Sequence, residues 1–138
     1  MIAGREADIM EHIDFPAIGA AGIAGFAFGA LWYTVLGKAW MKASGVSPDQ
    51  ARPAAAIMGL TFVCQIVIAF AMYGMMFHIG AGLAGAVLSA VLVWAGFILT
   101  TQIVNHRFQG RPWSLTAIDT GHWLGVLLVQ ALVLSLLG

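Results

Sequence analysis

The stretch AAAIMGLTFVCQIVIAFAMYGMMFHI, residues 54–79, decides the fold, because it contains no Asp, Glu, Lys or Arg. At 1.5 Å per residue, an α-helix of this length crosses a hydrocarbon core about 30 Å thick. Three similar apolar runs occupy about residues 16–37, 81–105 and 114–137. Transmembrane β-strands would be about 10 residues long and would alternate in polarity. The sequence therefore predicts an all-α integral membrane protein, a four-helix bundle with four transmembrane helices.

The composition excludes several other classes of protein. The chain has 138 residues, of which 61% are hydrophobic and 9% charged, against about 45–50% and about 25% in soluble domains. Its net charge is zero, so we expect no nucleic-acid partner. The single cysteine, Cys64, has no second cysteine to pair with in the chain. We expect an acidic extramembrane segment at 1–15, followed by one transmembrane domain at 16–138 in the lipid bilayer.

The ends of the helices are predicted from caps. Asp14 and Pro16 suit a helix start, with the acidic residue near the positive end of the helix dipole and proline in the first turn. Gly37 follows the first apolar run and is a candidate C-cap. The sequence Ser-Pro-Asp-Gln at 47–50 has the spacing of a capping box, which predicts a short interfacial turn at 48–52. Ser114 is the expected cap of the fourth helix.

Loop charge predicts the orientation. Segments 38–53 and 105–113 carry five of the six Lys and Arg residues, which places both in the cytoplasm by the positive-inside rule. Both termini should then lie on the outer, periplasmic side of a bacterial inner membrane. Aromatic and basic side chains at the same boundary are expected to anchor the helices there. The expected anchors are Trp32, Tyr33, Lys38, Trp40 and Trp113.

Small residues recur on the helix faces. Membrane helices approach one another closely at such positions, since lipid provides little hydrophobic force between helices. The expected packing positions are Ala17, Ala21, Gly25, Gly29, Gly85, Ser89, Gly96, Gly121 and Gly125. These faces suit packing within one chain, or an interface with a second copy or another protein.

The fourth apolar run contains ionisable residues. Asp119 and His122 are three residues apart and share a helix face. An ionised Asp inside a spanning helix costs about 2.5–3.5 kcal/mol on insertion scales, so Asp119 should face the bundle interior and find a partner, or be protonated. The predicted intramembrane polar site consists of Asn105, His106, Asp119, Thr120 and His122.

Three interpretations of this site remain open: a structural pair, a proton- or ion-handling site, and a metal or haem ligand set. A haem held by two histidines is unfavourable, because His78 and His122 lie at different depths. A metal bound by His106, Asp119 and His122 would still need a fourth ligand. We therefore expect no cofactor and no metal. No catalytic motif is present in the sequence, so we expect a protein that is not an enzyme.

The sequence LWYTVLGKAWM at 31–41 resembles a bacterial membrane family known as domain of unknown function 1761. A weaker match begins at Arg111-Pro112 and continues into the fourth apolar run. The resemblance covers roughly residues 15–137. It implies a four-helix membrane fold and no assigned activity.

These observations favour a non-enzymatic accessory or assembly subunit, in a homo-oligomer or a larger membrane complex. The alternative is a small proton- or ion-coupled transporter or channel that uses Asp119 and His122.

Overall fold

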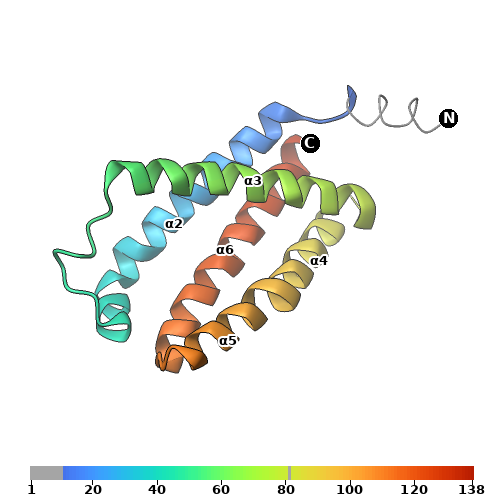
Figure 1. The fold of residues 1–138 in the computed structure, drawn as a ribbon. Coiled ribbons are helices and arrows are strands. Elements are labelled where there is room, and N and C mark those ends of the chain that lie inside the picture. The colour runs from blue at the N-terminus through green and yellow to red at the C-terminus, as the bar shows by residue number, and fades with distance from the viewer. Residues whose placement is uncertain (1–10, 81) are drawn as a thin grey trace.

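A computed structural model describes residues 11–80 and 82–138 of the chain. The described part is helical and contains no strand. Its elements are α2 (Phe15–Ser44), α3 (Ala55–Ile79), α4 (Leu83–Val93), the π-helical turn η1 (Trp94–Leu99), α5 (Thr100–Phe108) and α6 (Trp113–Leu137) (Figure 1). Because α4, η1 and α5 form one continuous span, four helices are long and apolar enough to cross a membrane. The predicted four-helix membrane fold is confirmed. The expected acidic segment lies mostly outside the described residues.

Helix α6 is the centre of the bundle. It packs against α2 on one side and against α4, η1 and α5 on the other, and α3 crosses over them (Figure 1). Where these helices meet, the buried side chains are mostly small or flexible. They include Ala21, Ala69, Met72, Ala86, Ala90, Val126, Leu127 and Ala131. Small side chains let the backbones approach, which is how helices associate in lipid.

Helix α2 is longer than the sequence predicted. It starts after Asp14, whose Oδ1 accepts from the backbone N–H of Ala17 at 2.9 Å, as expected. It continues through Gly37 and ends at Gly45, which has a left-handed φ of 74° and donates to the carbonyl of Met41. Glycine inside a helix costs only about 1 kcal/mol, so Gly37 does not end it. The C-cap expected at Gly37 was wrong.

The connection between α2 and α3 and the connection between α5 and α6 also test the predicted caps. Ser47 and Gln50 form the reciprocal bonds of a capping box, with Ser47 N donating to Gln50 Oε1 at 3.2 Å and Gln50 N to Ser47 Oγ at 3.4 Å. They close the predicted turn, and α3 starts later, at Ala55. Helix α6 starts at Trp113 after Pro112, without a side-chain cap. The cap expected at Ser114 was wrong, because Pro112 already fixes the helix start.

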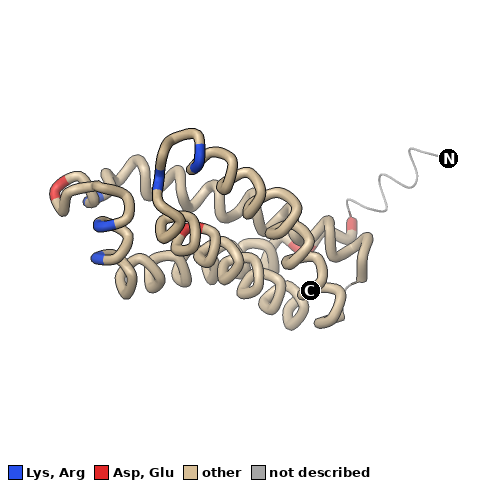
Figure 2. Tube along the Cα trace, turned by 90° about the horizontal axis from the view of Figure 1, so that it is seen from below, with Lys and Arg blue, Asp and Glu red and all other residues tan. Residues whose placement is uncertain are grey.

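The basic residues collect at one end of the molecule, opposite the C-terminus (Figure 2). This basic end is defined by Lys38, Lys42, Arg52, Arg107 and Arg111. Arg111 also ties two connections together, because its Nη1 donates to the carbonyl of Ser44 at 3.0 Å.

Candidate functional site

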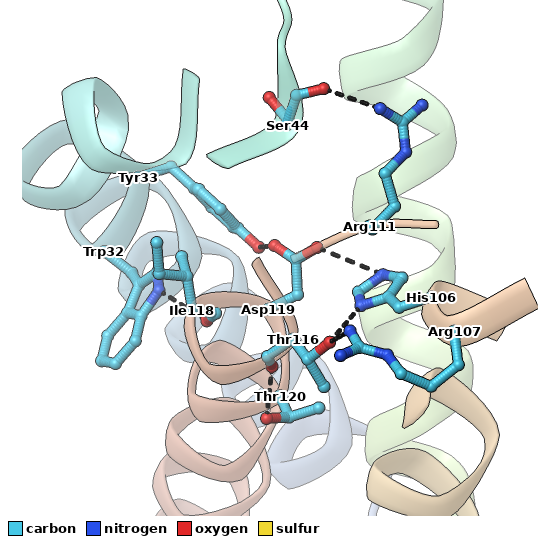
Figure 3. Close-up of polar contacts among 10 residues, drawn as sticks. All are labelled: Trp32, Tyr33, Ser44, His106, Arg107, Arg111, Thr116, Ile118, Asp119 and Thr120. Atoms are coloured by element: carbon cyan, nitrogen blue, oxygen red, sulfur yellow. Dashed lines mark hydrogen bonds and ion pairs between the residues drawn. The ribbon is translucent and has the colours of Figure 1, made fainter. Parts of the chain in front are cut away.

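Three helices meet at Asp119, near the basic end (Figure 3). Tyr33 of α2 donates its hydroxyl to Asp119 Oδ1 at 2.7 Å. His106 of α5 brings its Nε2 to 3.8 Å from Asp119 Oδ2. The side chains of His106 and Asp119 are only 13% and 20% exposed. The carboxyl group therefore joins α2, α5 and α6 in a half-buried position.

Thr116 extends this network by one turn of α6 toward the basic end. Arg107 Nη2 donates to Thr116 Oγ1 at 2.8 Å, and His106 Nδ1 lies 2.8 Å from the same oxygen. Since the hydroxyl oxygen already accepts from arginine, its own hydrogen is free to be donated to Nδ1. A neutral His106 then carries its hydrogen on Nε2, directed at Asp119. The hydrogen bonds run from Arg107 through Thr116 to His106, and the 3.8 Å contact of His106 with Asp119 continues the line to the carboxyl group.

His122 lies one turn deeper and contacts Tyr33 instead of Asp119. Its ring centroid is 4.9 Å from that of Tyr33 and 4.7 Å from that of Trp123. Its side chain is 6% exposed, and its Nδ1 is buried with no hydrogen-bond partner in the described part of the chain. Residues three apart are separated by about 60° around a helix, which is enough to turn Asp119 toward α5 and His122 toward α2. The expected direct pair is thus replaced by a contact through Tyr33.

The remaining predicted polar residues have different surroundings. Thr120 Oγ1 donates to the carbonyl of Thr116 at 2.6 Å, and the carbonyl of Thr120 accepts from Trp94 Nε1 at 2.7 Å. Asn105 is exposed and faces away from Asp119. Thr120 therefore serves the packing of α6, and Asn105 is outside the site in this conformation.

Two of the predicted membrane anchors point inward. Trp32 Nε1 donates to the carbonyl of Ile118 at 3.1 Å, and Tyr33 binds Asp119. Both side chains therefore bind α6, more than two turns before the end of α2, and their place at the membrane boundary stays a prediction. Lys38 is exposed, and Trp40 packs edge-on against Tyr33. Trp113 is exposed, with the Arg107 guanidinium 3.7 Å from its ring centroid.

The small residues mostly pack where helices cross. Ala17, Ala21, Gly25 and Ser89 are buried. A side chain at Gly29 would meet His122, one at Gly121 would meet Trp32, and one at Gly125 would meet Phe28. The exceptions are in the third span. Gly85 packs against Gly80 of its own hairpin, and Gly96 is exposed with open space beside it, so Gly96 packs against no other helix of the described chain.

The sequence analysis missed a buried amide pair. Gln130 of α6 donates its Nε2 to Gln65 Oε1 of α3 at 2.9 Å and to the carbonyl of Gln65 at 3.2 Å. The two residues are 0% and 2% exposed. Both lie against Gly25, where a Cβ atom would be 2.6 Å from each amide. A glutamine inside an apolar run is the signal that could have identified Gln130.

The arrangement suits proton exchange better than covalent chemistry. Thr116, His106 and Asp119 have the order of hydroxyl, imidazole and carboxylate found in nucleophilic triads. However, Thr116 is 3% exposed and its hydroxyl is bound to Arg107, so no substrate reaches it. Across residues 11–80 and 82–138, no group of three His, Cys, Asp or Glu side chains could hold a metal ion.

The polar network ends at His122. Between His122 and Gln130, α6 presents the fully buried side chains of Val126 and Leu127. The two polar groups are about 12 Å apart along the helix. Within one chain, the site is therefore connected to the basic end and separated from the other end by an apolar layer.

A family model described as "Protein of unknown function (DUF1761)" matches residues 16–135. No curated protein matches the chain, and no solved structure does.

Proposed function

Because this chain belongs to the family of proteins of unknown function DUF1761, we propose a function from its own contacts: a non-enzymatic accessory or assembly subunit of a homo-oligomer or a larger membrane complex. The observation that carries the proposal is the first half of α3. Residues 54–64 are all exposed, so three turns of a spanning helix have no buried face within the chain.

The same segment suits contact with another helix. Gly59 has open space beside it, which permits close backbone approach. Thr61 satisfies its hydroxyl within its own helix, by donating to the carbonyl of Ile57 at 2.8 Å. No polar group on this face needs water, so a second helix can cover it as readily as lipid does.

Crosslinking through a cysteine on the Gly59 face tests this proposal. Val63 is exposed and lies one helical turn after Gly59, so in a Val63→Cys chain with Cys64→Ala an assembly through this face brings the cysteines of two copies together. We expect a crosslinked dimer in native membranes and an oligomeric mass in mild detergent. Gly59→Leu should weaken both. Gly37→Leu is the matched control, since Gly37 also has open space beside it.

A monomeric mass, with no crosslinked dimer and no partner at fixed stoichiometry, would contradict the assembly role. If a defined partner binds wild type and Gly37→Leu but not Gly59→Leu, the complex is a hetero-assembly and the role stands.

We also propose a bacterial inner membrane location, with the basic end in the cytoplasm and both termini outside. The charge asymmetry supports this orientation. Single cysteines placed at Val46 and at Leu137, in a Cys64→Ala background, should react with an impermeant thiol reagent from opposite sides of the membrane. Labelling of both from the same side would exclude the four-span topology.

The second candidate function is proton- or ion-coupled transport, and the Tyr33–Asp119–His106 network favours it. Ionisable groups inside a membrane span are expensive and mark ion or proton pathways. Between His122 and Gln130 the buried α6 side chains Val126 and Leu127 are apolar, so α6 itself offers no polar path across this part of the described bundle. Transport would therefore need an assembly or a second conformation.

Asp119→Asn separates the two candidates. It keeps the shape of the side chain and a hydrogen-bond acceptor for Tyr33, and it removes the titratable group. If the protein transports protons or ions, liposome flux should be lost while the oligomeric mass is unchanged. Equal flux in wild type and Asp119→Asn would exclude this mechanism and leave the assembly role intact.

A further inference from the structure

The π-helical turn η1 shifts the register of the third span. Hydrogen bonds in a π turn run from residue i to i+5, so the turn holds one residue more than an α turn. With about 100° per residue in an α-helix, this extra residue rotates everything after Leu99 by about 100°. Helices α4 and α5 are continuous, but their faces are out of step by one residue.

The shift decides which residues of α5 meet α6. In this register His106 and Arg107 contact Thr116, and His106 faces Asp119. Asn105 and Val104 are exposed. If residues 94–99 formed an α turn instead, each later residue would take the place of the next one. Asn105 would then occupy the position of His106, beside Asp119.

We propose that η1 is a register switch, which alternates between a π and an α turn and so presents either His106 or Asn105 to Asp119. The switch would regulate the proton-handling role proposed above, and its function therefore rests on that proposal. With His106 in place, Asp119 faces a group that can take up a proton. With Asn105 in place, it faces a neutral amide that cannot. The same switch gives Asn105, singled out in the sequence, a place in the site.

The packing on either side of η1 permits this rotation. Helix α4 is held by its buried residues Ala86, Ser89 and Ala90, and Trp94 is held by its bond to Thr120. In contrast, η1 and α5 contain no buried residue. Helix α5 ends near Gly110, whose φ of 65° lies in the left-handed region that glycine readily adopts. The first part of the span is therefore held by buried side chains, whereas the second part is held mainly by Ile98 of η1 and by polar contacts of its last turn that the rotation can exchange.

After the rotation Thr116 of α6 still has a polar partner on α5, whereas Asp119 exchanges an imidazole for an amide. The titratable and charged groups that surround His106 are Asp119, Arg107 and Tyr33, with His122 behind Tyr33 and Arg111 at the following turn. After a one-residue shift His106 takes the place of Arg107 beside Thr116, and Arg107 moves on toward the basic end. Thr116 keeps a hydrogen-bond partner, and only Asp119 loses its imidazole.

Disulfide formation between α5 and α6 tests the switch by geometry, independently of transport. In a full-length Cys64→Ala chain in liposomes, Thr116→Cys is combined in turn with His106→Cys, Asn105→Cys or Val104→Cys, and each pair is oxidised with copper–phenanthroline. Val104 is the control, because it is 53% exposed here and would only take the exposed place of Asn105 after the shift. Deletion of Gly96 is the second variant, since it removes the extra residue and leaves a continuous α-helix with His106 facing α6.

We expect the 106–116 pair to form fastest and the 105–116 pair at about 0.1–10% of that rate, the population range of a minor state. The 104–116 pair should be slower still. Deletion of Gly96 should preserve the 106–116 pair and reduce the 105–116 pair to the level of the control. Equal rates for 105–116 and 104–116 in the undeleted chain would overturn the proposal. So would a 105–116 rate that stays above the control after deletion. If the Gly96 deletion does not insert, deletion of the exposed Phe97 replaces it.

Discussion

Gly25→Ala should destabilise the bundle, although alanine is a far better helix former than glycine. A Cβ atom at this position would lie 2.6 Å from Gln65 Oε1 and 2.6 Å from Gln130 Nε2. Overpacking of this kind costs about 1–3 kcal/mol, and disturbing the amide bond adds about 0.6 kcal/mol. The gain in helix propensity returns about 1 kcal/mol. The net effect is a loss of about 0.6–2.6 kcal/mol in the free energy of unfolding.

The assay is reversible unfolding by SDS in mixed micelles, followed by tryptophan fluorescence. Gly37→Ala is the control, because Gly37 has open space beside it in the same helix. It should be neutral or stabilising by up to about 1 kcal/mol. A double-mutant cycle with Gln130→Ala locates the clash, since the cost of Gly25→Ala should fall when one of its two close contacts is removed and Gln65 is released from its amide partner. Equal stability of Gly25→Ala and Gly37→Ala, or an unchanged cost in the Gln130→Ala background, would refute the reasoning.

Three further predictions use the same unfolding assay or a local probe. Tyr33→Phe removes the hydroxyl that donates to Asp119 and should cost about 1–3 kcal/mol, because a half-buried carboxyl group loses a donor; an unchanged midpoint would argue against this contact. Trp94→Phe removes the bond to the Thr120 carbonyl and should cost about 0.6 kcal/mol, whereas a midpoint above that of wild type would contradict it. Ser47→Ala breaks the exposed capping box with Gln50. It should speed proteolysis of the α2–α3 loop and lower the free energy of unfolding by no more than about 1 kcal/mol. An unchanged cleavage rate would show that the turn does not need the Ser47 hydroxyl.

The fold was predictable because it depends on length and polarity. Four apolar runs could be counted directly, and the cap at Asp14 and the turn at Ser47 to Gln50 follow from short-range chemistry. The end of α2 was not predictable in this way. Gly37 and Gly45 are both glycines that could cap the C-terminus of a helix, and only the left-handed backbone at Gly45 distinguishes them.

The candidate site was predictable in part, for a similar reason. The energetic cost of a buried carboxylate identifies Asp119 from its place in an apolar run. Its partners are separated from it by up to 86 residues and depend on tertiary packing. The contact of Tyr33 with Asp119 could not be read from the position of Tyr33 near the end of the first apolar run. The register of His106 depends on η1, and no residue pattern in WAGFIL predicts a π turn.

The central position of α6 has a consequence for biogenesis. The hydroxyls of Thr61, Thr100 and Thr101 donate to carbonyls of their own helix, so these groups are satisfied as soon as each helix forms. Most of the remaining cost of placing polar side chains in lipid, at Asp119, His122 and Gln130, falls on α6, which leaves the ribosome after the other three spans.

Tyr33, Gln65 and His106, which contact α6, precede it in the chain and have already been synthesised when α6 enters the membrane. Because of this order, the carboxyl group of Asp119 enters the bilayer when Tyr33 and His106 are already available to contact it. Moving α6 to the N-terminus by circular permutation would preserve every contact of the finished bundle, but its most polar helix would then have to insert alone.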